Sequence, residues 1–366
     1  MTVYLVEVLF IAVFGLTVKP YLNQQRKLFF LGTVFVVLTV VSGLRAFSVG
    51  MDTRHYVTMF RNADLFGVIN TRIEIGFVLF VKFLHFFSDD PQILLFASSA
   101  ICIGSACLFS FLFSKDTILS MLLYVLMGSY FSQMTAMRQT LALSLTMLSF
   151  AITLTSERRL KRVLAVLLII LASSIHTVAI IALLPFFLIV FKKMLVKEGK
   201  RTAEIGFIQS VSFAIIAFLG YSIIMRLAAL LFPGYIHYFS GTWSDANYNA
   251  SLFNSLIALS FMVFGAIIFR NRELNSTQSF GVVMISLSFI FSVLSMRMEI
   301  WNRVTGFFSI YTYLLWAPEF VSAAHSAKQK RILKDIIVLA AFVYMIVVQT
   351  FRPEWAGVVP YVFFQT

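Results

Sequence analysis

Residues 93–113 read ILLFASSAICIGSACLFSFLF, a run of 21 residues without a charged side chain. As an α-helix this run would rise about 31 Å, close to the ~30 Å thickness of the hydrocarbon layer of a bilayer. A helix pairs its backbone N–H and C=O groups within the segment, which hydrocarbon requires. The stretch therefore predicts a membrane-spanning helix.

The composition of the whole chain extends this prediction. The 366 residues are 60% hydrophobic and only 12% charged, and the mean hydropathy is +0.91. Soluble domains carry about 25% charged residues, so a soluble enzyme, a disordered chain and a fibrous protein are excluded. The net charge of +13 comes from short basic clusters between apolar runs, which is typical of cytoplasmic loops rather than of nucleic-acid binding. We predict an all-α polytopic membrane protein, one transmembrane domain over 1–366 without a soluble domain.

Other apolar runs are long enough to be further spans, and two segments are ambiguous. The run 163–191 is interrupted by Ser173, Ser174 and His176, and we interpret it as two short helices with the histidine near their turn. The segment 73–87 contains Glu74, Lys82 and His85, and it is short and polar for a span. The clear candidates are 2–18, 28–47, 93–113, 117–132, 139–155, 205–225, 251–269, 277–296, 303–320 and 335–350.

The basic clusters decide the expected orientation. They lie at 19–27, 158–162, 192–201, 270–272 and 328–334, and the positive-inside rule places all of them in the cytoplasm. All five clusters lie on the cytoplasmic side if the run 163–191 crosses the membrane twice and the segment 73–87 is re-entrant or interfacial. The sequence then predicts about 12 transmembrane helices with both termini outside the cytoplasm.

In this topology, arginine and lysine are distributed differently between the two sides of the membrane. Of 12 lysines, 11 fall on the cytoplasmic side, whereas nine of 17 arginines fall on the outer side. The planar guanidinium matches phosphate and carboxylate through two parallel hydrogen bonds, so the pattern favours an anionic oxygen ligand. Individual snorkelling, or pairing with Asp52, Glu74 or Glu299, is the alternative. The outer arginines are Arg45, Arg54, Arg61, Arg72, Arg138, Arg226, Arg297, Arg303 and Arg352.

Two carboxylates lie close to predicted outer boundaries. Arg45 falls in the last turn of the predicted span 28–47, and Gly50, Asp52 and Tyr56 follow it. Glycine permits the turn out of the membrane. Glu74 opens the segment 73–87, and a carboxylate entering an apolar run needs a partner, for which an outer arginine is suited. Asp52 and Glu74 either take part in chemistry or hold arginines in place.

Arg138 and His176 are the polar residues most deeply placed among apolar runs. Arg138 stands between two spans beside Gln139, and no acidic residue within 15 positions can neutralise it. The free-energy cost of placing the Arg138 charge in an apolar environment favours a functional role for this residue. A neutral histidine can abstract or relay a proton near neutral pH. His176 is equally well explained as a packing residue bonded to Ser or Thr.

A further polar string marks another outer boundary. Arg297, Glu299, Asn302 and Arg303 surround an interfacial tryptophan at 301. The string suits substrate positioning and anion binding, or an ion-paired loop within an aromatic belt.

Several common chemistries lack a sequence signal. The chain has no P-loop, no GxGxxG before a helix, no HExxH and no GxSxG. Cys102 and Cys107 fall on different helix faces, and no second ligand stands at metal-binding spacing from His176. We therefore expect neither a metal nor a cofactor.

The sequence resembles the EpsG family of bacterial exopolysaccharide proteins, which are Wzy-like repeat-unit polymerases. The resemblance rests on an ordered set of short motifs spread over nearly the whole chain. One departure is Thr177-Val178-Ala179, where a small residue is expected nearer the histidine. The motifs are RAFSVGMDTRHY at 45–56, EIG at 74–76, MRQTLA at 137–142, SIHT at 174–177, Arg303 at the start of a span and PYVFF at 360–364.

The resemblance implies polymerisation of polyprenyl-diphosphate-linked oligosaccharides at the outer face of the bacterial cytoplasmic membrane, in exopolysaccharide or capsule biosynthesis. A flippase and a chain-length regulator would be partner proteins, and undecaprenyl diphosphate the lipid carrier. In this interpretation Arg138, Arg303, Arg45 and Arg297 bind the diphosphate. The remaining roles are catalysis by His176, Asp52 and Glu74, and substrate positioning by Tyr56, Gln139, Glu299 and Asn302.

Three alternatives remain open from the sequence. A lipid-linked-sugar glycosyltransferase or ligase would use the same site with another acceptor. A transporter or flippase of the lipid-linked glycan would carry inverted repeats and broken helices near the midplane, and no repeat is visible. His176 also leaves a membrane acyltransferase open.

Overall fold

The computed structural model describes residues 1–64, 73–195, 203–231 and 248–364. The protein is all-helical: 81% of it is helix, and the described residues contain no strand. One isolated antiparallel bridge joins Arg45 to Phe363. The predicted all-α class is confirmed.

The chain divides into two compact units, 1–183 with 328–366, and 184–327. That residues 1–366 act as one transmembrane domain stays a prediction. The first unit holds α1 Thr2–Val18, α2 Gln24–Gly43, α3 Thr53–Arg61, α4 Ile75–His85, α5 Gln92–Phe113, α6 Thr117–Leu126, α7 Ser129–Thr135, α8 Met137–Thr155, α9 Arg159–Ile175, the 3₁₀ helix η1 Thr177–Ala182, α17 Ala327–Phe351 and η4 Pro353–Trp355. The second holds α10 Leu183–Leu195, α11 Ala203–Leu219, α12 Tyr221–Leu231, α13 Tyr248–Ile268, α14 Ser276–Ser295, α15 Ile300–Tyr311, the π-helical η3 Thr312–Trp316 and α16 Ala317–Ala323.

Among the described residues, six helices are long and apolar enough to cross a membrane, namely α2, α5, α8, α13, α14 and α17. The helices α6 and α7 make a seventh if they form one span, bent by 47° at its break. Several shorter apolar helices, including α1 and α4, accompany them. This shows a protein with several membrane-spanning helices. The count of about 12, the sidedness of the termini and the re-entrant or interfacial placement of 73–87 stay predictions.

Some of the predicted spans agree with the observed helix bounds, and others do not. The run 93–113 is α5, and 73–87 contains the 11-residue helix α4, which rises only about 16 Å. The interruption of 163–191 is a real break, since α9 ends at Ile175 and His176 is extended. The prediction that Arg45 lies in the last turn of its span is wrong, because α2 ends at Gly43.

Contacts distant in sequence end α2 early. The side-chain amide of Gln92 donates to the carbonyls of Gly43 and Arg45. The backbone N–H of Ala46 donates to Val362 in the C-terminal segment at 2.8 Å. These partners bond to backbone groups that a longer helix would pair internally. Hydropathy does not reveal such distant contacts, so the sequence placed the end of α2 too late.

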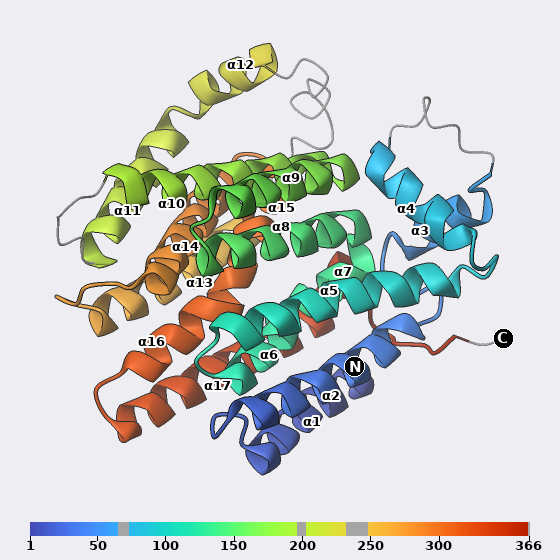
Figure 1. Cartoon of the computed structure of the whole chain (residues 1–366), viewed down its shortest axis with the longest axis horizontal. Helices are drawn as coiled ribbons and strands as arrows, with labels where there is room; N and C mark the ends of the chain where they lie inside the picture. Colours follow the sequence, from blue (N-terminus) through green and yellow to red (C-terminus); the bar gives the residue numbers. More distant parts are fainter. Residues whose placement is uncertain (65–72, 196–202, 232–247, 365–366) are drawn as a thin grey trace. The chain divides into compact units, whose positions relative to one another are not determined.

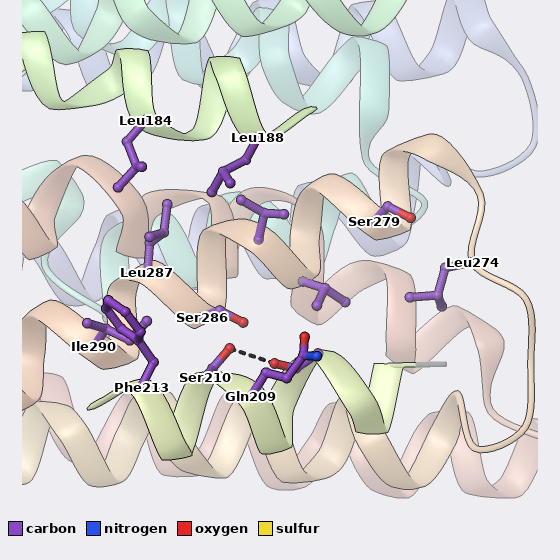
Figure 2. Close-up of a pocket in the computed structure, with 13 residues that line it drawn as sticks. Leu184, Leu188, Gln209, Ser210, Phe213, Leu274, Ser279, Ser286, Leu287 and Ile290 are labelled. Atoms are coloured by element: carbon purple, nitrogen blue, oxygen red, sulfur yellow. Dashed lines mark hydrogen bonds between the residues drawn. The ribbon is translucent and has the colours of Figure 1, made fainter. Parts of the chain in front are cut away.

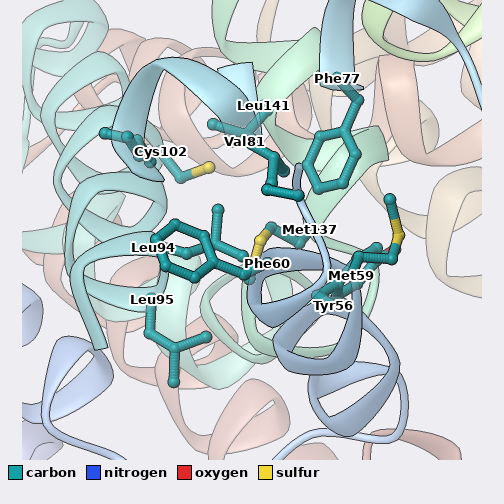
Figure 3. Packing of buried hydrophobic residues seen from close by; sticks show 12 residues of the cluster. Tyr56, Met59, Phe60, Phe77, Val81, Leu94, Leu95, Cys102, Met137 and Leu141 are labelled. Atoms are coloured by element: carbon teal, nitrogen blue, oxygen red, sulfur yellow. The ribbon is translucent and has the colours of Figure 1, made fainter. Parts of the chain in front are cut away.

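In the first unit, α2 packs along α5 and α8 packs along α9, as Figure 1 shows. The side chains of α3, α4, α5 and α8 meet in a cluster of buried hydrophobic residues. In Figure 3, Phe60 of α3, Phe77 and Val81 of α4, Leu94 of α5 and Met137 of α8 belong to this cluster. Burial of these side chains fixes the positions of Tyr56, Glu74 and Arg138, each of which belongs to the cluster or lies within three residues of a member.

The C-terminal segment lies against the loop after α2. Gly50 adopts a φ of 93°, which glycine accommodates without strain, and its N–H donates to Gly357 at 2.7 Å. The hydroxyl of Tyr361 donates to the carbonyl of Val41, and that of Tyr4 donates to the carbonyl of Val358. The predicted turn at Gly50 is therefore held by residues more than 300 positions later in the chain.

In the second unit, the indole of Trp316 is fully buried between two helices. A Cβ on Gly265 of α13 or on Gly281 of α14 would overlap the indole ring. The indole N–H donates to the carbonyl of Phe261 at 3.1 Å. The two glycines thus let α13 and α14 approach a large aromatic side chain.

Gly265→Ala should lower the melting temperature of the detergent-solubilised protein, because the added methyl displaces the indole at an overpacking cost of about 1–3 kcal/mol. Thermal unfolding followed by tryptophan fluorescence measures this. The matched control is Gly32→Ala in α2, where a Cβ meets nothing within 4 Å and the free energy of unfolding should change by less than about 1 kcal/mol. Equal melting temperatures for Gly265→Ala and the wild type would contradict the described packing.

Candidate functional site

An ion pair between Glu74 and Arg138 forms the centre of the site. Glu74 precedes α4, and Arg138 lies in the first turn of α8. Arg138 Nη1 donates to Glu74 Oε2 at 2.6 Å. The Arg138 and Glu74 side chains are 25% and 20% exposed, so the pair is partly buried but within reach of a ligand. Glu74 is thus paired with an arginine, as expected. That Arg138 lies on the outer side stays a prediction.

His176 and Thr177 hold the other carboxylate oxygen of Glu74. The backbone N–H of Thr177 donates to Glu74 Oε1 at 3.1 Å, and the Thr177 hydroxyl donates to it at 3.2 Å. His176 Nδ1 lies 3.4 Å from the same oxygen, and the imidazole is only 10% exposed. Both residues stand where α9 ends and η1 begins. We define Glu74, Arg138, His176 and Thr177 as the Glu74 cluster.

The surroundings keep Glu74 ionised. Burial raises the pKa of this carboxyl, but the hydrogen bonds from His176 and Thr177 and the charge of Arg138 outweigh burial and lower it to about 2. Each of these partners favours the charged form of the carboxylate. Glu74 therefore presents a negative charge to His176 throughout the neutral range.

Tyr56 of α3 contacts the Glu74 cluster. Its hydroxyl interacts with the Arg138 guanidinium, which opposes the rise in the Tyr56 pKa that burial causes. The ring packs edge to face against Phe77 of α4 at 5.4 Å between centroids. Asp52 stands at the start of α3, and its side chain is exposed and acts electrostatically on Tyr56. The predicted site residues Tyr56, Glu74, Arg138 and His176 are therefore brought together, with Asp52 close by.

A close approach of α4 and α9 makes the cluster possible. A Cβ on Gly76 would overlap both the hydroxyl and the backbone of Ser174, so only glycine fits there without moving a helix. This contact places Glu74 beside His176, two residues beyond Ser174. Sequence reasoning missed the role of Thr177 in the cluster, although a hydroxyl directly after a histidine at a helix break was a usable signal.

Arg45 is not part of this cluster. It is fully buried, and Nη1 donates to the carbonyl of Ser42 at 2.5 Å, while Nε and Nη2 have no hydrogen-bond partner among the described residues. Burial lowers the pKa of Arg45 to about 10, which leaves it charged at neutral pH. Its backbone bridges to Phe363. This placement favours a structural role for Arg45 over the predicted contact with a diphosphate.

Of the remaining predicted site residues, one lies in the first unit and the others lie in the second. Gln139 follows Arg138 in α8 and is half-buried. In the second unit, the guanidinium of Arg297 lies 4.2 Å from the ring centroid of Phe218, and Asn302 donates to Glu299 at 2.9 Å. Arg303 is half-buried in the first turn of α15. Over the described ranges, no three His, Cys, Asp or Glu side chains are arranged to hold a metal ion.

The second unit contains a cavity of about 470 Å³ between α10, α11 and α14. Figure 2 shows Leu184 and Leu188 on one side of it and Ser210 and Phe213 on another, with Ser286 of α14 between them. The lining is mostly aliphatic. The cavity was not foreseen from the sequence, because α12 and α13 lie between α11 and α14 in the chain and only the packing brings these walls together.

Residues 28–363 match the model of the EpsG family. The chain belongs to the EpsG family. EpsG membership covers nearly the whole chain and indicates a membrane protein of the polysaccharide polymerase type. No curated protein and no solved structure matches it.

Glu74→Gln should destabilise the EpsG protein most at neutral pH. Because pairing holds the pKa of Glu74 in the folded protein at about 2, below its ordinary 4.5, the ionised carboxylate stabilises the fold fully above about pH 4.5. This contribution is lost as the pH falls from about 4.5 toward 2. The gap in melting temperature between wild type and Glu74→Gln should therefore narrow over that interval.

Glu354→Gln is the matched control for this experiment. Glu354 lies 3.7 Å from Arg352, with its side chain 59% exposed, and exposed ion pairs contribute little to stability. The melting temperature of the Glu354→Gln variant should equal that of the wild type at every pH. A gap for Glu74→Gln that stays constant from pH 7 to pH 2 would contradict the ion-paired state.

Proposed function

We propose that this EpsG protein is a polymerase that joins polyprenyl-diphosphate-linked oligosaccharide repeat units at the outer face of the bacterial cytoplasmic membrane. The observation that carries the proposal is the Glu74 cluster. Its carboxylate, guanidinium and imidazole come from three distant parts of an apolar chain. The carboxylate and the guanidinium are partly accessible, and the imidazole lies buried beside them. Ionisable groups kept at such positions in a membrane protein are costly, which favours a functional role.

The proposed reaction is a glycosyl transfer. A hydroxyl of one lipid-linked glycan attacks the anomeric carbon that joins the other glycan to its lipid diphosphate. A new C–O glycosidic bond forms, the bond from the anomeric carbon to the diphosphate oxygen breaks, and its electron pair leaves with the diphosphate. The hydroxyl proton passes to a base on the protein and then to water.

The geometry suits His176 as that base. Its Nδ1 faces the ionised Glu74, which favours a proton on Nδ1 and leaves Nε2 as the proton acceptor. A carboxylate also stabilises the imidazolium that forms after proton transfer, as in other carboxylate–histidine pairs. Thr177 holds the carboxylate by two hydrogen bonds, so Glu74 acts as a positioning residue rather than as the base.

Arg138 suits the leaving group. One terminal nitrogen is bonded to Glu74, while Nε has no hydrogen-bond partner among the described residues. A guanidinium held rigidly by a carboxylate can donate its remaining N–H groups to a diphosphate and stabilise the charge that develops on it. In the first unit we assign Tyr56 and Gln139 to positioning the glycans and keep Asp52 as a second candidate base. In the second unit we assign Arg297 and Arg303 to diphosphate binding, and Glu299 and Asn302 to positioning.

His176→Gln and Arg138→Lys should each abolish polymer formation by the purified protein supplied with a lipid-linked repeat unit. Loss of a positioned base lowers the rate by about 10²–10⁴-fold, and lysine lacks the planar fork of arginine. Product ladders resolved on a gel measure this. Arg331→Lys, whose side chain is 85% exposed, is the control and should give the wild-type ladder.

The same assay separates the competing functions. A wild-type product extended by a single unit would favour a ligase over a polymerase. Movement of intact lipid-linked glycan across a vesicle membrane, without any new glycosidic bond, would favour a flippase. Full-length ladders from both His176→Gln and Arg138→Lys would overturn the assignment of the Glu74 cluster.

Gly76→Ala should also reduce polymer formation, although residue 76 carries no reactive group. The added methyl pushes α4 away from Ser174, and even a displacement of about 1 Å lowers activity strongly, by roughly 10²-fold. Gly104→Ala is the control, because its Cβ meets only Phe35, at 3.4 Å. Equal activity of the two alanine variants, at equal amounts in the membrane, would contradict the positioning role of Gly76.

A further inference from the structure

The cavity of the second unit lies along two neighbouring helices. On α11 its lining begins at Gly206 and ends at Phe213, and on α14 it extends from Ser279 to Ile290. The 11-residue separation on α14 corresponds to about 16 Å of helix, close to the depth of one leaflet of the hydrocarbon layer. Since α14 is a membrane-spanning candidate, the cavity lies at the depth of lipid chains.

The walls of the cavity suit hydrocarbon. Leucine, valine, isoleucine and phenylalanine side chains predominate, and the polar minority is Gln209, Ser210, Ser279 and Ser286. The Ser286 hydroxyl is buried and has no hydrogen-bond partner in the described part of the chain. Phe213 and Leu188 are 58% and 46% exposed, so the lining continues onto surface that would face lipid in a bilayer.

A cation lies at one end of the same pair of helices. Arg297 lies two residues beyond the end of α14, and its guanidinium lies 4.2 Å from the ring centroid of Phe218 on α11. Phe218 lies five residues beyond Phe213, and Arg297 lies seven beyond Ile290. These separations correspond to about 8 Å along α11 and about 10 Å along α14. The cation and the cavity therefore belong to one α11–α14 seam.

The end with Arg297 also has the character of a membrane boundary. Trp301 stacks on Phe291 at 5.5 Å between centroids, and its indole N–H interacts with the hydroxyl of Tyr221. Tryptophan and tyrosine concentrate at the level of lipid headgroups. An anionic headgroup there would meet the exposed Arg297, while its hydrocarbon chain would enter the cavity.

We propose that the α11–α14 seam binds the carrier lipid of the polymerase substrate, with the first isoprene units of a polyprenyl chain in the cavity and the diphosphate at Arg297. This deepens the proposed function and rests on it for the identity of the lipid. A diphosphate offers more charge to a guanidinium than the single phosphodiester of a phospholipid. The cavity selects the chain and Arg297 selects the headgroup.

Photocrosslinking to the purified protein tests the proposal. The probe is a short polyprenyl diphosphate that carries a diazirine on its first isoprene units, and mass spectrometry locates the labelled peptides. Labelling should fall in 184–188, 206–213 and 279–290. Unlabelled polyprenyl diphosphate should compete at a roughly tenfold lower concentration than the uncharged polyprenol, because the charge-assisted contact with Arg297 is missing from the alcohol.

Two matched pairs of variants sharpen the test. Arg297→Gln should weaken labelling by roughly tenfold, whereas Arg270→Gln, before the opposite end of α14, should leave it unchanged. Phe213→Trp should reduce labelling of α11 and α14, because the larger ring enters the cavity. Ile216→Trp should not reduce it, because Ile216 is 66% exposed and is not part of the lining.

The outcomes separate this proposal from the proposed function. Equal competition by an anionic phospholipid, or labelling spread evenly over the lipid-facing helices, would overturn the seam as a carrier-lipid site. Polymer formation without labelling of the cavity would overturn the seam alone. Specific labelling of the cavity by a protein that makes no polymer would support the seam and overturn the polymerase function.

Discussion

The ion pair between Glu74 and Arg138 is the constraint on which the first unit depends. A guanidinium among apolar helices is costly when it is alone, and so is a carboxylate. At 2.6 Å each compensates the other, and the pair joins the start of α4 to the start of α8. Because Glu74 also accepts two hydrogen bonds from Thr177, the same carboxylate connects both helices to the end of α9.

The cluster uses one carboxylate for two purposes. Its charge stabilises the packing of α4, α8 and α9, and it sets the orientation of His176. A residue with both roles explains why the chain retains a charged group where an apolar one would pack at lower cost. It also explains why Gly76 is needed: a larger residue would separate the two helices that carry Glu74 and His176.

Charge is arranged differently in the two units. In the first unit, Arg45 is fully buried and fixes the loop after α2 against the C-terminal segment, while Arg138 stays accessible in the Glu74 cluster. In the second unit, Arg297 lies at the end of an apolar cavity along α11 and α14. The first unit thus holds a carboxylate–histidine pair, and the second holds an apolar cavity with a cation at the end of the same two helices.

The sequence by itself determined the all-helical membrane class, the apolar helix 93–113, the break at His176 and the EpsG relationship, because hydropathy and short motifs are local properties of the chain. It also indicated that Glu74 needs an arginine. Only the tertiary structure decided that this arginine is Arg138, 64 residues away, that Arg45 is buried instead of facing a ligand, and that three helices enclose a cavity. Those outcomes depend on which distant side chains share one interior, and a buried charge is stabilised by whichever partner the packing brings within a few ångströms.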